Sequence, residues 1–292
     1  MRMRTVLVLT LLLTGCGASA TSTSGRVNVV AAENVYGDIA SQIGGPHVSI
    51  TSILTNPNAD PHLFEPKSSN GLAVAVANVV LQNGLGYDAF MTRLEDAAPS
   101  SSRIVVTMSD VLGVHGKDAN AHLWYDVPAL RRIALAVADA LTRADPRHGP
   151  AYHEGLIRFI QSLGPLMHEV ATIRARYKGV PVAYTEPVPG YLLSAAGLRN
   201  LAPDSFTRPI EEGTEPSPTA VAAMNDLITK HRVHILLYNS QAVSPITARL
   251  RDAARRAGIP VVPVTETLPP GLTFQRWQLR QAQALAGALQ QP

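Results

Sequence analysis

Short runs of β-branched and apolar residues alternate with helical patterns along most of this chain, and this alternation constrains the fold more than any other feature. It favours parallel sheets covered by helices, which is the α/β class. Strands buried in such sheets are apolar throughout, and residues 104–106 and 235–237 have this character. The predicted strands are residues 27–32, 48–54, 79–82, 104–108, 180–185, 235–238 and 261–265.

A long helical stretch separates the first four predicted strands from the last three. Across residues 151–178, apolar side chains recur at the spacing of one helix face. Gly164-Pro165 interrupts this stretch, and a proline inside a helix costs about 3 kcal/mol, so we expect a kink or a break there. The sequence therefore predicts two similar α/β lobes joined by one long helix. Each lobe is expected to be a mostly parallel sheet flanked by helices. The boundaries are residues 27–147 for the N-terminal lobe, 148–178 for the linking helix and 179–292 for the C-terminal lobe.

The N-terminus has the form of a secretory signal. Arg2 and Arg4 precede a short apolar run that ends in Leu13-Thr14-Gly15-Cys16, and this run is too short to span a bilayer. The placement of Cys16 resembles a bacterial lipobox, which implies cleavage before Cys16 and its acylation. We therefore expect a signal peptide over residues 1–15 and a lipidated flexible tether over residues 16–26. Such a protein is secreted across the cytoplasmic membrane and anchored to its outer face by lipid. An ordinary signal peptide that happens to contain a cysteine is the alternative.

Composition excludes several other classes. Cys16 is the only cysteine, so an intramolecular disulfide framework is ruled out and stability must come from an ordinary core. The formal net charge is only +3 and there is no long basic run, so we expect no nucleic-acid partner.

Histidine and carboxylate residues occur at four places where predicted strands or loops should meet. His62 lies in a proline-stiffened loop between two carboxylates, and His122 lies among aromatic residues. Glu186 and Glu266 each follow the end of a predicted strand, where ligands bind in open α/β sheets. Taken singly, each position is weak, because a loop histidine is usually a surface residue and a glutamate after a strand is usually solvated.

As an ordered set, these positions resemble a known family, the zinc- and manganese-binding solute-binding proteins of bacterial ABC importers, known as the cluster A-I type. The resemblance covers essentially the whole chain from about Val27. The elements that carry it are Asp60-Pro61-His62 with Phe64-Glu65-Pro66, Asn83-Gly84-Leu85, Ala121-His122-Leu123-Trp124-Tyr125-Asp126, Thr185-Glu186 with Gly190-Tyr191, Glu215-Pro216-Ser217 and Thr265-Glu266-Thr267.

The resemblance implies a metal site between the lobes. His62 and His122 from the N-terminal lobe and Glu186 and Glu266 from the C-terminal lobe would hold one divalent transition metal ion as transported ligand. An ABC importer permease would be the partner, and we expect a monomer without enzymatic activity. Glu266 stands where the family commonly carries Asp, which leaves its coordination by one or two oxygens open.

The donor set is consistent with this implication. Two imidazoles and two carboxylates suit Zn²⁺, Mn²⁺ or Fe²⁺ and disfavour Cu(I). Two negative charges neutralise a dication, and binding must release protons. In the family, a carboxylate at the third position is commoner in manganese or iron binders, and a His-rich loop before the second histidine is a zinc feature. Glu186 and the single histidine of that loop, His115, therefore favour Mn²⁺ slightly over Zn²⁺.

Two other functions stay open at this point. The same fold could bind a siderophore or another organic ligand, but such a site needs an aromatic-lined cleft and aromatic residues are only 5% of the chain. A secreted metallohydrolase would also gather His and Glu. However, His153-Glu154 is not followed by the second histidine of a His-Glu-x-x-His helix, and no Gly-x-Ser-x-Gly elbow occurs.

Overall fold

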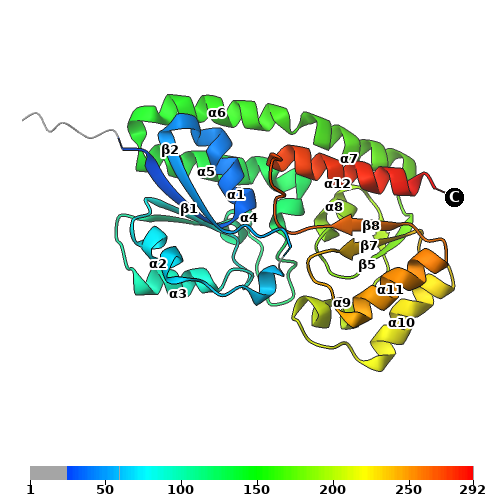
Figure 1. The fold of residues 1–292 in the computed structure, drawn as a ribbon. Helices are drawn as coiled ribbons and strands as arrows, with labels where there is room; N and C mark the ends of the chain where they lie inside the picture. The colour runs from blue at the N-terminus through cyan, green and yellow to red at the C-terminus, as the bar shows by residue number, and fades with distance from the viewer. Residues whose placement is uncertain (1–24, 59, 292) are drawn as a thin grey trace, which may run out of the picture.

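The computed structural model describes residues 25–58 and 60–291, and these residues form two lobes side by side (Figure 1). Cys16, the signal peptide and most of the expected tether lie outside the described residues. Each lobe is built on one four-stranded sheet in which all neighbouring strands are parallel. The predicted α/β class with two similar lobes is confirmed.

The two sheets have the same topology. The first contains β1 (Val27–Glu33), β2 (Val48–Leu54), β3 (Val79–Gln82) and β4 (Ile104–Thr107) in the order β2-β1-β3-β4. The second contains β5 (Pro181–Tyr184), β6 (Arg199–Asn200), β7 (Ile235–Asn239) and β8 (Val261–Val264) in the order β6-β5-β7-β8. In each sheet, the chain leaves the two central strands toward opposite edges of the sheet. A crevice opens between the two loops that follow such strands.

Two strands differ from the sequence prediction. The apolar run 104–106 was expected to be buried, but β4 is an edge strand and Val105 is 41% exposed. In contrast, β7 lies in the middle of its sheet and is buried along its whole length. Strand β6 was not predicted, because it has only two residues and neither is buried.

Helices cover both faces of each sheet (Figure 1). In the N-terminal lobe, α1, α5 and α6 pack on one another, while α2 and α3 lie on the other side. In the C-terminal lobe, α10 and α11 pack together opposite α7 and α12. The helices are α1 (Asn34–Gly44), α2 (Ser68–Ala75), α3 (Phe90–Ala97), α4 (Met108–Leu112), α5 (Leu130–Ala144), α6 (Gly149–Ser162), α7 (Gly164–Tyr177), α8 (Gly190–Ala195), α9 (Asp204–Glu211), α10 (Pro218–Thr229), α11 (Pro245–Arg256) and α12 (Phe274–Leu289).

The predicted linking helix is a long bent rod made of α6 and α7 (Figure 1). The two helices meet at Leu163, directly before Gly164-Pro165, and the proline occupies the first turn of α7. A proline in the first turn of a helix lacks only an N–H that would have no helical partner anyway. The break is therefore at the expected place, and the proline starts the second helix.

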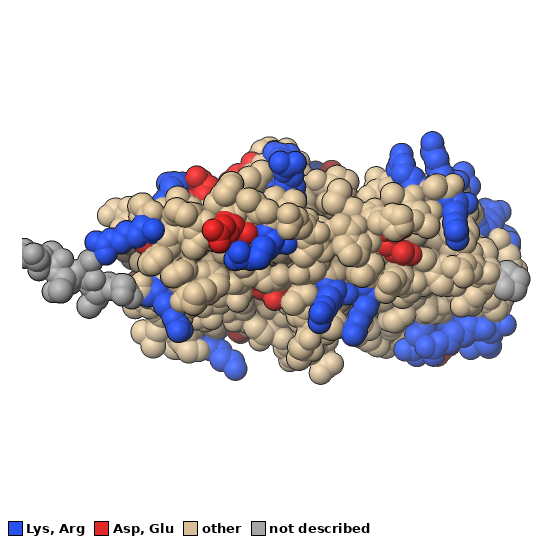
Figure 2. All heavy atoms as spheres, turned by 90° about the horizontal axis from the view of Figure 1, so that it is seen from above, with Lys and Arg blue, Asp and Glu red and all other residues tan. Residues whose placement is uncertain are grey.

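A second connection between the lobes comes from α12, which packs along α7 and reaches back to α1. The backbone N–H of Phe274 donates to Asp38 Oδ2 at 2.8 Å, and Gln42 and Gln275 exchange amide hydrogen bonds. One apolar core runs through this region and includes strand residues from both sheets, such as Val30 and Leu237. Figure 2 views this helical face, where Lys and Arg side chains gather mainly toward the end formed by the C-terminal lobe.

No helix among residues 25–58 and 60–291 has the length and apolar character needed to cross a membrane.

Candidate metal centre

The four residues singled out from the sequence all lie at loops that face the junction of the two lobes. His62 is in a single helical turn, η2 (Pro61–Leu63), and His122 directly precedes another, η3 (Leu123–Tyr125). Glu186 lies two residues after β5, one of the two central strands of its sheet, and Glu266 lies two residues after β8. His122, Glu186 and Glu266 are almost completely buried, with exposed fractions of 0%, 1% and 1%.

Three of the four side chains converge on one point. The Nε2 atom of His122 lies 3.1 Å from Glu266 Oε2, and the Nε2 atom of His62 lies 3.5 Å from the same oxygen. One potential ligand atom from each of these residues lies within 4.8 Å of the other two. Ligand atoms about 2.1 Å from a shared ion stand roughly 3.0–3.4 Å apart at octahedral or tetrahedral angles. The two nitrogen–oxygen distances are therefore close to the spacing of ligand atoms on a shared transition metal ion.

Glu186 stands beside this cluster but outside the group of three. The side-chain amide of Asn239 joins it to the others, because Nδ2 donates to Glu186 Oε2 at 2.5 Å and to Glu266 Oε1 at 2.7 Å. Within the described part of the chain, the second oxygen of Glu186, Oε1, is buried without a hydrogen-bond partner. A buried carboxylate oxygen without a donor is costly unless it meets a cation.

The hydrogen bonds around His122 fix the form of its ring. Asn120 Oδ1 accepts from the backbone N–H of His122 at 3.0 Å and lies 2.8 Å from its Nδ1 atom. Nδ1 therefore carries a proton, and Nε2 is the nitrogen whose lone pair is available to a metal ion. Nε2 faces a carboxylate oxygen of Glu266 at 3.1 Å.

Charges in the cluster are strongly coupled. Burial alone lowers the pKa of the His62 imidazole, but the Glu266 carboxylate and then Asp60 and Glu186 outweigh burial and raise that pKa to about 9. Burial together with the charge of Glu266 raises the pKa of Glu186 to about 8. Burial opposes ionisation of Glu266, yet the two imidazoles hold its pKa well below the usual range. At neutral pH without metal, His62 and Glu186 thus hold protons that a dication would displace.

Sequence reasoning missed the residues that support the ligands. Tyr87 donates its hydroxyl to Glu266 Oε2 at 2.8 Å, and the Gln241 side chain accepts from the backbone N–H of Glu266 at 2.5 Å. Asn120 and Asn239 complete this set. Asn239 directly follows the predicted strand 235–238 and ends the observed strand β7, which was a usable signal. The other three come from loops, where nothing in the local sequence marks the distant partner.

Three acidic residues near the histidines were candidates to orient the imidazoles. Asp60 lies close to His62, but it accepts from the backbone N–H of that residue at 2.9 Å, so it holds the turn. Glu65 is exposed, and no described bond joins it or the Asp126 side chain to either imidazole. Proximity in sequence was a poor guide, since the residue beside Nδ1 of His122 is an amide, Asn120.

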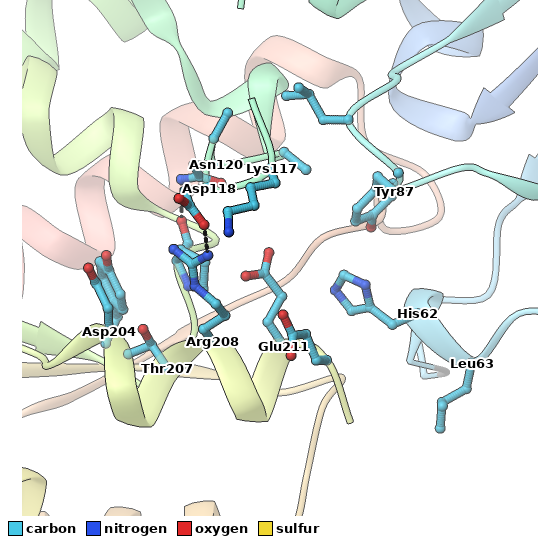
Figure 3. Close-up of a pocket in the computed structure, with 17 residues that line it drawn as sticks. His62, Leu63, Tyr87, Lys117, Asp118, Asn120, Asp204, Thr207, Arg208 and Glu211 are labelled. Atoms are coloured by element: carbon cyan, nitrogen blue, oxygen red, sulfur yellow. Dashed lines mark hydrogen bonds and ion pairs between the residues drawn. The ribbon is translucent and has the colours of Figure 1, made fainter. Parts of the chain in front are cut away.

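A pocket of about 500 Å³ leads to the site from solvent. Of the four candidate ligands, His62 lines it, and Figure 3 shows His62 and Glu211 facing into the same space. Glu211 Oε1 lies 3.8 Å from His122 Nδ1, so a carboxylate stands between the pocket and the buried ring. An ion pair between Asp118 and Arg208 joins the two lobes across the pocket (Figure 3).

Two similar parallel sheets, a bent linking rod and a polar site between the lobes define the class of metal-type solute-binding proteins. The family model described as zinc-uptake complex component A, periplasmic, matches residues 29–288. The chain belongs to this family.

Solved structures show the same fold. A periplasmic zinc-binding protein from Treponema pallidum matches with a TM-score of 0.77 and 18% identity, covering 91% of this chain and 100% of that one. The solute-binding protein FpvC from Pseudomonas aeruginosa, in complex with Mn²⁺, also has a TM-score of 0.77 and 18% identity, over 91% of this chain and 98% of that one.

Among curated proteins, a manganese-binding lipoprotein of Halalkalibacterium halodurans is 29% identical over 175 residues, 57% of this chain and 58% of that protein. A manganese ABC transporter substrate-binding lipoprotein of Streptococcus gordonii is 25% identical over 240 residues, 76% of this chain and 75% of that protein. The matched region thus spans a little over half of the first relative and three quarters of the second.

Proposed function

We propose that this protein captures one divalent transition metal ion, Mn²⁺ or Zn²⁺, between its lobes and delivers it to an ABC importer permease. The ligands in this proposal are His62, His122, Glu186 and Glu266. The observation that carries it is the convergence of two imidazole nitrogens on one carboxylate oxygen, next to a second buried carboxylate with an oxygen that lacks a hydrogen-bond partner. Two carboxylates would neutralise the dication, which lets the loaded site stay buried.

Mn²⁺ is slightly favoured over Zn²⁺ as the ion carried. The third ligand is a carboxylate, Glu186, and oxygen donors suit manganese. The relatives from H. halodurans and S. gordonii are named for manganese. Intrinsic affinity nevertheless increases from Mn²⁺ to Zn²⁺ at most sites, so metal supply also decides which ion is bound.

Elemental analysis of protein purified without added metal, followed by competition between Mn²⁺ and Zn²⁺, tests this proposal. One equivalent of either ion supports it. Protein that binds neither ion at micromolar concentration contradicts it, and preferential binding of a siderophore supports the organic-ligand alternative.

The proposal includes export and anchoring by lipid at Cys16, action as a monomer, and transport in place of catalysis. Several relatives are named lipoproteins, which supports the anchor. Cys16→Ala should abolish lipid labelling and leave the protein uncleaved or released into the medium. A correctly trimmed Cys16→Ala protein that stays on the membrane contradicts the anchor.

A further inference from the structure

Asn120 touches the metal site and both lobes at once. It lies in the loop between α4 and η3, and its Oδ1 atom serves His122 of the N-terminal lobe. Its Nδ2 atom donates to the carbonyl oxygen of Pro187 in the C-terminal lobe at 2.7 Å. Its own carbonyl oxygen accepts from the hydroxyl of Tyr191 at 2.9 Å. Pro187 directly follows Glu186, so this one side chain links two of the four proposed ligands.

The orientation of the Asn120 amide follows from its partners. A backbone N–H can only donate and a carbonyl oxygen can only accept, so Oδ1 must face His122 and Nδ2 must face Pro187. With Oδ1 facing the ring, Nδ1 of His122 must be the protonated nitrogen. The backbone N–H of His122 and the contact to the C-terminal lobe together therefore fix which nitrogen of His122 is free to bind metal.

We propose that Asn120 is a positioning residue that couples lobe contact to the metal-binding form of His122. Local opening of this interlobe contact breaks the bonds to Pro187 and Tyr191, so the Asn120 amide keeps its bond from the backbone N–H of His122 but loses its restraint from the C-terminal lobe, and its hold on His122 Nδ1 weakens. This contact thus holds the ring ready, and its local opening favours release. This inference rests on the proposed function and identifies a residue that controls it.

A neighbouring interlobe contact is a weaker candidate for this coupling. Asp118 and Arg208 also join the lobes, but their side chains are 60% and 40% exposed. Exposed ion pairs contribute little, because water screens them and two long side chains must be held in place. Asp118 therefore offers a matched control: it lies in the same loop, crosses the same gap and does not contact His122 through any described bond.

Gly190 provides a second way to disturb the same amide. A Cβ atom at this position would lie 2.7 Å from Asn120 Nδ2, which is too close, so the amide would have to move. Gly190→Ala should therefore displace the Asn120 side chain by a substitution in the C-terminal lobe, while the sequence of the N-terminal lobe stays unchanged.

The test compares Asn120→Ala, Asn120→Asp and the control Asp118→Ala in the full chain. For each variant, the Kd for Zn²⁺ and the rate of Zn²⁺ release to a chelator are measured, together with the melting temperature without metal. Asn120→Ala should weaken binding about 10- to 100-fold, the usual cost of losing a group that orients a metal-binding histidine, while melting as wild type does. Asp118→Ala should change the Kd and the release rate less than about twofold.

Asn120→Asp separates the two halves of the inference. A carboxylate still accepts from both N–H groups of His122, so the Kd should stay within a few-fold of wild type. It cannot donate to Pro187, so release should be at least several-fold faster than in wild type. If Asn120 had a purely structural role, its substitution by Asp would not change the release rate while leaving the Kd nearly unchanged.

Nitrogen-15 NMR of the His122 ring gives a readout that needs no metal. In wild type, Nδ1 should carry a proton that is protected from exchange, and in Asn120→Ala this protection should disappear. Should Asn120→Ala fail to fold, Gly190→Ala is expected to lose protection in the same way.

Two results would overturn the inference: wild-type Kd and release rate in Asn120→Ala, or an unprotonated Nδ1 in wild type. Wild-type protein that binds no metal but shows the protected Nδ1 proton would instead overturn the proposed function.

Discussion

The two lobes share one topology but use it differently, and the clearest contrast is at the ends of their central strands. In the N-terminal lobe, β1 ends in Glu33 and Asn83 directly follows β3. In the C-terminal lobe, Glu186 closely follows β5 and Asn239 ends β7. A glutamate and an asparagine therefore occupy corresponding places in both lobes, but it is the C-terminal pair that contacts the candidate metal site.

In the N-terminal pair, the asparagine supports the loop that carries His122, and the glutamate is buried. Asn83 Nδ2 donates to the carbonyl oxygen of Ala121 at 2.8 Å, which holds the chain next to His122. Glu33 is 2% exposed and lies beside Asp88, and burial followed by the charge of Asp88 raises the pKa of Glu33 well above its ordinary value. In the C-terminal lobe, the same residue types contact the metal site itself through the bonds of Asn239.

The largest expected effect comes from removing a proposed ligand. His122→Ala and Glu266→Ala should each lower metal affinity by about 10²- to 10³-fold or more, because the remaining donors leave the ion incompletely coordinated. At metal one hundred times the Kd, wild type should gain about 2.7 kcal/mol of stability, and these variants should lose most of it. Titration calorimetry and melting curves with and without metal measure both effects.

His115→Ala is the control for these variants, because this exposed loop histidine lies outside the cluster. If wild type and all ligand variants bound metal equally well, the metal site could not lie at the loops where the two lobes face each other.

Metal affinity should also depend steeply on pH. His62, with its pKa raised to about 9, and Glu186, with its pKa raised to about 8, both hold protons at neutral pH in the metal-free protein. Metal must displace these protons, so affinity rises with pH and levels off above about pH 9. Each displaced proton changes the Kd about tenfold per pH unit. Calorimetry in buffers of different ionisation enthalpy counts the protons released, and binding without proton release would contradict this charge arrangement.

The same substitution at corresponding places in the two lobes tests the contrast between them. Glu186→Gln should weaken metal binding about 10- to 100-fold, because an amide replaces a charged ligand. Glu33→Gln should leave the Kd within about twofold, because Glu33 is buried outside the cluster of candidate ligands. A large loss of affinity in Glu33→Gln would mean that both lobes supply ligands from their central strands.

Glu33→Gln should instead change stability with pH. The pKa of Glu33 is raised on folding, so the unfolded chain ionises first as pH rises above about 4.3, and this favours unfolding. Glutamine removes this effect. The melting temperature of the variant should rise relative to that of wild type as pH is raised from 5 to 8. If the difference between the two melting temperatures stayed constant, this would argue against a protonated Glu33.

The contrast between the lobes also explains what the sequence could predict. Strands β2 and β3 were predicted with their observed bounds, because β-branched periodicity is local. Glu186 and Glu266 could be found because each follows such a strand. Tyr87, Asn120 and Gln241 could not be predicted, because their roles depend on partners in distant loops, as in the bond from Tyr87 to Glu266. The return of α12 to α1 was missed for the same reason.

The smallest expected effect is a change of shape on metal binding. The lobes are joined by the α6–α7 rod, by α12 and by one continuous apolar core, so a large hinge motion would have to expose buried apolar surface. Hydrogen bonds next to the ligands add to this, since Tyr125 donates to the carbonyl oxygen of Thr265 at 2.6 Å. We therefore expect the radius of gyration from solution scattering to change by less than about 1 Å when metal is added. Metal would then act on side chains and on local contacts such as that of Asn120. A decrease of several ångströms in the radius of gyration would show that the lobes move as independent bodies and that the shared core rearranges when metal binds.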